Sequence, residues 1–231
     1  MLVEDDSLRY TVQYSDRRRT VALHIKDGQL LVKAPADFAL AAIAELVAAK
    51  RGWVEKHLKL SQTRSKPDWL TLGRVPLLGS ELQLIYQRDS RSYVEQSQNA
   101  LLLSVSTRVS SLRYERALMT QLTLWYQQQA QQWFNAGVIK WQNVMQLQPG
   151  AVYIGNWRSK WGYCKQNGDV GFNWRLVMAP QWVAEYVIVH ELAHLKYMNH
   201  SPRFWQLVGL HYPEYKTAQH WLKQNAYWMD I

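Results

Sequence analysis

Four residues in the C-terminal third of the chain have the types and spacing of a catalytic metal site. His190 and Glu191 are followed by His194, which gives the pattern His-Glu-x-x-His, and His200 lies six residues further on. No glycine or proline interrupts residues 183–197, and apolar residues recur there at spacings of three and four, which predicts a helix. On a helix, His190 and His194 share one face, where two imidazoles can bind the same zinc ion.

Glu191 and His200 complete the predicted site. Glu191 lies about 100° around the helix from His190, so its carboxylate can hold a water molecule beside the metal without acting as a ligand. Ser201-Pro202 is a typical N-cap and first helical position, so the metal helix should end near residue 198 and a new helix should follow. A histidine in that turn is the natural third ligand. Three protein ligands with one open position are typical of catalytic zinc, whereas structural zinc is closed by four.

The composition is that of a globular protein without disulfide bonds or a membrane-spanning helix. The 231 residues are 48% hydrophobic, which is enough for a substantial core, and the single cysteine, Cys164, excludes an intrachain disulfide. We expect Cys164 to be a small buried apolar residue rather than a nucleophile or a fourth ligand. The N-terminus is acidic and lacks the apolar region of a signal peptide, and no run of eighteen apolar residues occurs. We therefore expect a cytoplasmic protein without a membrane partner.

The formal net charge of +9 favours anionic partners. A weak interaction with nucleic acid or nucleotides is one interpretation. A solvated basic surface is the other, because the basic residues are scattered along the chain.

The N-terminal part alternates strand and helix patterns. Residues 9–34 are predicted to form a β-hairpin with its turn at Asp27-Gly28, and residues 38–62 to form one helix weakened at Gly52. After a polar linker, residues 69–106 are rich in strand patterns, beginning with a strand at Trp69–Leu72.

The C-terminal part is predicted to position the metal site. Residues 112–146 form one long helix, or two helices joined near Gly137. Residues 151–179 form a hairpin around an Asn-Gly turn, which should wall the cleft and offer an edge strand to an extended peptide. Two more helices, over 202–210 and 213–224, follow the metal helix. We expect an N-terminal α/β part over residues 1–110 and a catalytic part over 111–231, or one continuous domain.

Four motifs resemble the YgjP-like metallopeptidase family, compact zincins related to SprT-like proteases. The motifs are Lys160-Trp-Gly-Tyr-Cys164, Asn173-Trp-Arg-Leu176, Val189-His-Glu-Leu-Ala-His-Leu195 and Asn199-His-Ser-Pro-Arg-Phe-Trp205. The resemblance is specific over residues 151–225 and looser over 9–62. It implies an α+β, zincin-like fold with a mixed or antiparallel sheet and an active-site helix, preceded by a β-rich N-terminal part. It also implies zinc ligands at His190, His194 and His200, and a general base at Glu191.

The resulting functional hypothesis is a zinc-dependent peptidase that acts on proteins or peptides. The alternatives are a metal-dependent nucleoside triphosphate hydrolase using the same site, a nucleic-acid-associated protease, and a non-enzymatic nucleic-acid-binding module with structural zinc. The candidate cleft-lining residues are Trp161, Gly162, Tyr163 and Asn199. The carboxylates considered for orienting a metal histidine are Glu185, Glu214 and Asp169.

Overall fold

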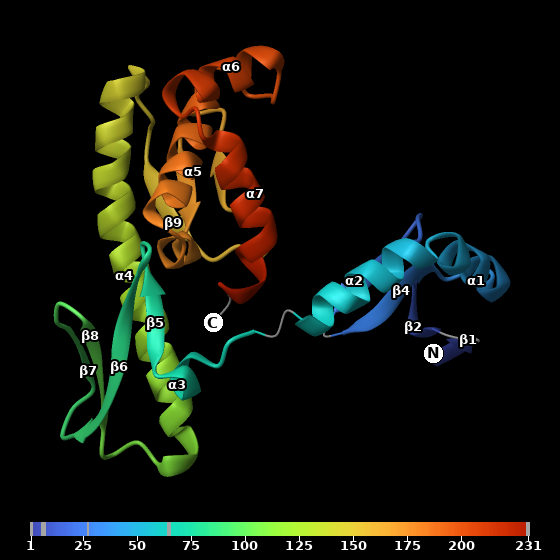
Figure 1. Cartoon of the computed structure of the whole chain (residues 1–231), viewed down its shortest axis with the longest axis horizontal. Helices are drawn as coiled ribbons and strands as arrows, with labels where there is room; N and C mark the ends of the chain where they lie inside the picture. The colour runs from blue at the N-terminus through green and yellow to red at the C-terminus, as the bar shows by residue number, and fades with distance from the viewer. Residues whose placement is uncertain (1, 6–7, 27, 64–65, 230–231) are drawn as a thin grey trace. The chain divides into compact units, whose positions relative to one another are not determined.

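The computed structural model describes residues 2–5, 8–26, 28–63 and 66–229 and has an α+β fold. The chain divides into two compact units, residues 1–65 and residues 66–231. The division predicted from the sequence, residues 1–110 and 111–231 or one continuous domain, stays a prediction. Figure 1 traces the elements of both units. None of the described helices is both long and apolar enough to cross a membrane.

The N-terminal unit is a four-stranded sheet with two helices. Its strands β1 (Leu2–Asp5), β2 (Leu8–Ser15), β3 (Ala22–Lys26) and β4 (Gln29–Pro35) lie in the order β1-β2-β4-β3. The predicted antiparallel hairpin is formed by β3 and β4, while β2 pairs with β4 in parallel. In the predicted turn, Gly28 has φ +74°, and Asp27 lies outside the described residues.

The single helix predicted over residues 38–62 is two helices, α1 (Leu40–Ala49) and α2 (Arg51–Thr63). The break is at Lys50, whose φ of −103° and ψ of 12° leave the helical region, so the prediction of one continuous helix was wrong. Gly52, which we expected to weaken the helix, lies within α2. The apolar faces of α1 and α2 cover the sheet through Ile43, Val47 and Val54.

The second unit begins with another four-stranded sheet. After the short helix α3 (Trp69–Leu72) come β5 (Arg74–Leu77), β6 (Ser80–Asp89), β7 (Tyr93–Gln96) and β8 (Ala100–Ser106), in the order β5-β6-β8-β7. Its pattern of one parallel pair flanked by two antiparallel pairs repeats that of the N-terminal sheet. The two sheets therefore share one topology.

The predicted strand at Trp69–Leu72 is a helical turn, and the prediction was wrong. Asp68 accepts hydrogen bonds from the Thr71 amide and hydroxyl, and Gly73 ends the turn with φ +64°. These local capping interactions outweigh the strand propensity of the four residues.

Residues 111–229 form the remainder of the second unit. Helix α4 (Ser111–Met145) is continuous through Gly137, so the one-helix alternative is correct. Next come β9 (Val152–Gly155), β10 (Gly162–Cys164), β11 (Val170–Asn173), the 3-10 helix η1 (Trp174–Met178), α5 (Gln181–Ala193), α6 (Pro202–His211), α7 (Tyr215–Asn225) and η2 (Ala226–Trp228). The small sheet has the order β10-β11-β9, with β10 antiparallel and β9 parallel to β11.

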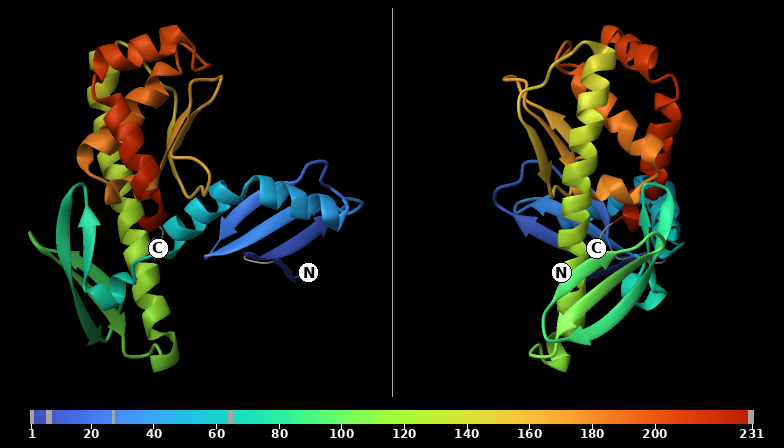
Figure 2. Two further views of the ribbon diagram at one scale, coloured as in Figure 1. Left: turned by 45° about the vertical axis from the view of Figure 1, so that its right-hand side comes forward. Right: turned by 90° about the vertical axis from the view of Figure 1, so that its left-hand side faces the viewer.

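Helix α5 is the centre of the second core. It contacts α4, α6, α7 and both strands β10 and β11, and Figure 2 shows it beside α4 and α7. Apolar residues occupy nearly its whole circumference, which is typical of a buried helix rather than a surface one. At Gly137 of α4, an added Cβ would lie 2.6 Å from Cδ1 of Ile188, so the two helices touch where α4 lacks a side chain.

The sheet β5–β8 supports the start of α5 indirectly. The Leu78 amide donates to the Val177 carbonyl at 2.7 Å, and the buried Tyr126 hydroxyl of α4 donates to the Pro76 carbonyl. These bonds tie the β5–β6 hairpin to η1 and α4. The 3-10 helix η1, which leads into α5, is thereby held against the β5–β6 hairpin.

Candidate metal centre

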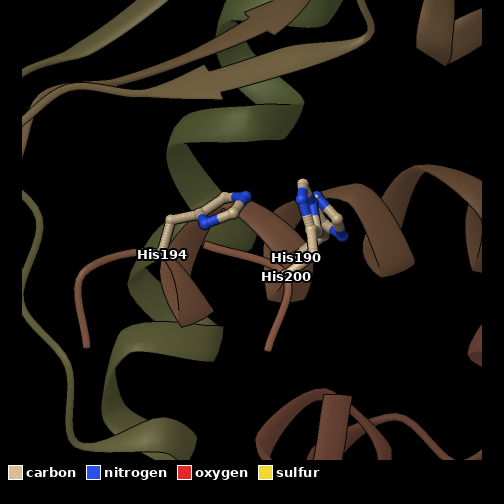
Figure 3. A group of neighbouring side chains, drawn as sticks. All are labelled: His190, His194 and His200. Carbon is tan, nitrogen blue, oxygen red and sulfur yellow. Dashed lines mark hydrogen bonds between the residues drawn. The ribbon is translucent and has the colours of Figure 1, made fainter. Parts of the chain in front are cut away.

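The three histidines of the motif converge in the structure, as Figure 3 shows. One ring nitrogen from each of His190, His194 and His200 lies within 4.8 Å of the others. The Nε2 atoms of His190 and His200 are 3.1 Å apart. Two nitrogens bound to one tetrahedral zinc at the usual distance lie about 3.3 Å apart, so the His190–His200 pair has the spacing that such an ion requires.

The helical spacing of His190 and His194 is preserved, although α5 is shorter than predicted. The helix ends at Ala193, and His194 is its C-cap with a helical backbone, so the predicted end near residue 198 was wrong. The reason is local: the His194 Nδ1–H donates to the Tyr197 carbonyl at 3.0 Å, and the amides of Leu195 and Lys196 bond to carbonyls three residues back. The chain turns there instead of continuing as helix.

His200 reaches the site because the next helix begins where the sequence predicted. Ser201 caps α6 by accepting the Phe204 amide at 3.4 Å, and Pro202 is the first helical residue. This places Phe204, which is fully buried, under all three imidazoles, with ring centroids 4.5–5.0 Å from theirs. Trp205 stacks on the His200 ring at 5.5 Å.

Phe204, Trp205 and Tyr186 were not predicted as site residues. The Tyr186 hydroxyl lies 3.2 Å from Nδ1 of His190. Its spacing of four residues before His190 on the same helix was the available signal. For Phe204, the signal was its place in the first turn after the Ser-Pro cap.

The interactions that orient the helical histidines involve a hydroxyl and a carbonyl rather than a carboxylate. A donated bond to the Tyr197 carbonyl fixes the proton of His194 on Nδ1 and leaves the Nε2 lone pair for a metal. Two of the three candidate carboxylates, Glu185 and Asp169, are engaged elsewhere, and the Glu214 side chain makes no capping bond. Glu185 pairs with Lys140 at 2.8 Å, Asp169 accepts from the Ala151 amide, and Glu214 is the N-cap of α7.

Burial keeps the helical imidazoles neutral. It lowers the pKa of His190 to about 3, with smaller contributions from His194 and His200, and it also lowers the pKa of His194. The neutral imidazole is the form that binds metal, so the two rings are in their ligating state over the physiological range.

Glu191 is buried beside the histidines, with 5% of its surface exposed. Burial raises the pKa of its carboxyl to about 8, and the positive charge of Lys160 opposes this. A divalent cation at the three histidines would act in the same direction as Lys160 and favour the carboxylate.

Gly162 of β10 lies directly against Glu191. A Cβ added at Gly162 would be 2.5 Å from Oε1 and 2.8 Å from Cδ of the Glu191 carboxylate. The carboxylate can therefore occupy its position only because the strand lacks a side chain there. Gly162, one of the predicted cleft residues, is thus in direct contact with the carboxylate proposed as the base.

A cavity of about 350 Å³ opens beside the centre. Its lining comes from β10 and the loop before it, from α5 and from α7: Trp161, Gly162, Tyr186, Val187, His190, Glu191, Gln219 and Leu222. Two of the four predicted cleft residues, Trp161 and Gly162, are in this set. Tyr163 points to the other face of the sheet, where its ring covers Gly171, and Asn199 is exposed in the turn before His200.

Cys164 is half-buried on β10 and does not join the histidine group among the described residues. Burial, together with the charges of Glu191 and Asp169, raises the pKa of its thiol to about 11. The thiol is therefore protonated at neutral pH, which suits neither a nucleophile nor a metal ligand.

Comparison with family models places this geometry in context. The model described as YgjP-like, metallopeptidase domain matches residues 19–225. The chain belongs to the YgjP-like family. The match confirms the resemblance seen in the motifs and extends it through β5–β8. No curated protein and no solved structure gives a match. The YgjP-like domain identifies a metallopeptidase in general terms, and the three histidines are a group able to hold its metal ion.

Proposed function

We propose that this YgjP-like protein is a zinc-dependent peptidase that hydrolyses peptide bonds in proteins or peptides. The observation that carries the proposal is the convergence of three imidazole nitrogens beside the buried carboxylate of Glu191. Three neutral nitrogen ligands with room for a fourth, non-protein ligand form the donor set of catalytic zinc sites.

His190, His194 and His200 would hold the ion. Zinc bound there supplies Lewis acidity, which lowers the pKa of a water molecule and polarises a carbonyl group. The Tyr186 hydroxyl and the Tyr197 carbonyl keep the Nδ1 side of the two helical rings occupied, so that Nε2 would be left to hold the ion.

Glu191 is the proposed general base. Its carboxylate accepts a proton from the attacking water and returns it to the leaving amine. Burial raises the pKa of this carboxyl, and a bound cation would oppose that rise and favour the carboxylate that accepts the proton. Contact with Gly162 restricts the carboxylate to one position.

A peptide is the substrate that best suits the surrounding backbone. Among the described strands, β10 pairs only with β11, so its other edge is free to bind an extended segment. A peptide added there by main-chain hydrogen bonds would run past Gly162, and thus beside Glu191. The cavity lined by Trp161, Val187 and Leu222 would receive a side chain next to the cleaved bond.

The test compares Glu191→Gln with Glu185→Gln in the zinc-loaded full chain. Both changes replace a carboxylate by an amide on α5, but Glu185 pairs with Lys140 rather than facing the histidines. We expect wild type and Glu185→Gln to cleave unstructured casein, and Glu191→Gln to retain stoichiometric zinc and lose cleavage. Cleavage by Glu191→Gln would refute the base assignment. Release of phosphate from a nucleoside triphosphate without any proteolysis would refute the substrate class.

A further inference from the structure

The face of the β9–β11 sheet opposite to α5 carries aromatic rings interleaved with lysines. Because side chains alternate along a strand, Gly162 and Cys164 face α5, and Tyr163 faces the other way. Tyr163 is paired in register with Gly171, and Gly171 with Tyr153. The two tyrosines therefore stand on one face, on either side of a glycine.

Two glycines let the rings lie close to the sheet. A Cβ added at Gly171 would be 2.3 Å from Cε1 of Tyr163, and one added at Gly155 would be 2.2 Å from Cζ2 of Trp157. Trp157 and Tyr163 meet edge to face, with centroids 5.0 Å apart. Any larger residue at either glycine would push a ring away from the strands.

Lysines lie between these rings. The Lys160 ammonium is 4.7 Å from the centroid of Tyr163 and 5.2 Å from that of Trp157. The Lys165 ammonium is 5.3 Å from the centroid of Tyr153 and 5.7 Å from that of Tyr163. Asp169 pairs with Lys165 at 3.6 Å, but the lysine side chain remains 54% exposed. We call Tyr153, Trp157, Lys160, Tyr163 and Lys165 the aromatic–lysine surface.

The chemistry of this surface fits one class of partner. Exposed ammonium groups attract phosphates, and aromatic side chains stack on unpaired bases whatever their sequence. An acidic peptide would use the lysines and leave the rings without a role, and a duplex would keep its bases out of reach of the rings. The exposed fraction of Tyr153, 44%, leaves its ring available. The net charge of +9 adds long-range attraction for a polyanion.

We propose that the aromatic–lysine surface binds single-stranded nucleic acid. Lys160 and Lys165 contact backbone phosphates, and Tyr153 and Trp157 stack on two neighbouring bases. This binding goes beyond the proposed peptidase activity and needs no metal. Because Lys160 and Trp161 are adjacent in the chain, a strand held there lies near the cavity beside the metal centre.

The test measures the affinity of the full chain for a labelled oligo-dT of twelve nucleotides by fluorescence anisotropy at several salt concentrations. Two phosphate contacts predict a slope of log K against log salt of about −1.4, and Lys160→Ala should reduce its magnitude by about 0.7. Tyr153→Ala removes one stacking ring and should weaken binding by at least about fivefold. Lys223→Ala on α7, an exposed lysine away from the sheet, is the matched control and should bind like wild type.

Four results would overturn the proposal. The first is no binding of oligo-dT by the wild-type chain at 50 mM salt, and the second is wild-type affinity in both Tyr153→Ala and the double variant Lys160→Ala/Lys165→Ala. The third is equal affinity for double-stranded and single-stranded DNA. The fourth is displacement of bound oligo-dT by poly-glutamate of equal charge. Because Tyr153 is exposed, its variant should fold, and circular dichroism checks this. Peptidase assays on the same preparations distinguish a failure here from a failure of the proposed function.

Discussion

Replacing Gly162 by alanine is the sharpest test of how the site is built. The added methyl group would lie 2.5 Å from Oε1, 2.7 Å from Cγ and 2.8 Å from Cδ of Glu191. Ordinary contact begins near 3.4 Å, so the carboxylate must retreat by about 1 Å. Because Glu191 is 5% exposed, it has little free space to enter, and the strand or α5 must also shift.

The expected effect falls on turnover rather than on metal binding. A displacement of about 1 Å at a catalytic group costs roughly 100-fold in rate, and overpacking costs about 1–3 kcal/mol of the free energy of unfolding. The three atoms nearest to the added methyl group all belong to Glu191 and none to a histidine, so zinc affinity should stay within a few-fold of wild type. The assays are kcat/KM on a peptide cleaved by wild type, zinc affinity by competition with a chromophoric chelator, and thermal unfolding.

Gly171→Ala is the matched control for this variant. It is the same substitution on the neighbouring strand, but its methyl group meets the Tyr163 ring on the other face of the sheet. We expect a similar loss of stability and a kcat/KM within a few-fold of wild type. If Gly162→Ala cleaves as fast as Gly171→Ala, then contact with β10 does not hold the base, and the reasoning is wrong.

Three further predictions concern the metal centre. Tyr186→Phe removes the hydroxyl beside Nδ1 of His190 and should lower zinc affinity about 10–100-fold in a chelator competition; unchanged affinity would contradict the orienting role. Phe204→Ala removes the fully buried ring under the three imidazoles and should lower the free energy of unfolding by about 3–5 kcal/mol in urea titrations, whereas a loss below about 1 kcal/mol would mean that the site collapses around the gap. In chelator-treated protein, Glu191 keeps its proton up to a pKa of about 8 in the folded state but only to 4.5 when unfolded, so stability should fall as pH rises towards 8. The lowered pKa of His190 has the opposite effect but acts only below pH 6.5, so the fall should be clearest between pH 6.5 and 8 and absent in Glu191→Gln.

The sequence alone determined which three histidines form the candidate metal centre, and it determined much of the fold. Two histidines four residues apart share a helix face whatever surrounds the helix, because that relation depends only on helical geometry. The Ser201-Pro202 cap likewise fixed the start of α6 and the turn that carries His200. The hairpin of β3 and β4 and the long helix α4 followed from turn residues and apolar periodicity, which are also local signals.

Other features depended on contacts between residues far apart in the chain. The approach of Gly162 to Glu191 requires β10 to cross α5 at one register, and a shift of one residue would place Tyr163 there instead. Sequence patterns could not assign the two faces of β10, so Tyr163 was predicted in the cleft and is found on the opposite face. The helical turn at Trp69–Leu72 was predicted as a strand because its four residues favour strands. So short a pattern is outweighed by the capping interactions of Asp68 and Gly73.

The three histidines that lie together could therefore be predicted from the sequence, whereas the residues packed around them could not. Local spacing along one helix fixes which side chains face a common point. The burial that raises the pKa of Glu191, the ring of Phe204 under the histidines and the glycine that admits the carboxylate are set by packing between separate elements. Those elements meet only in the folded chain, because tertiary packing rather than sequence proximity brings β10, α5 and α6 together.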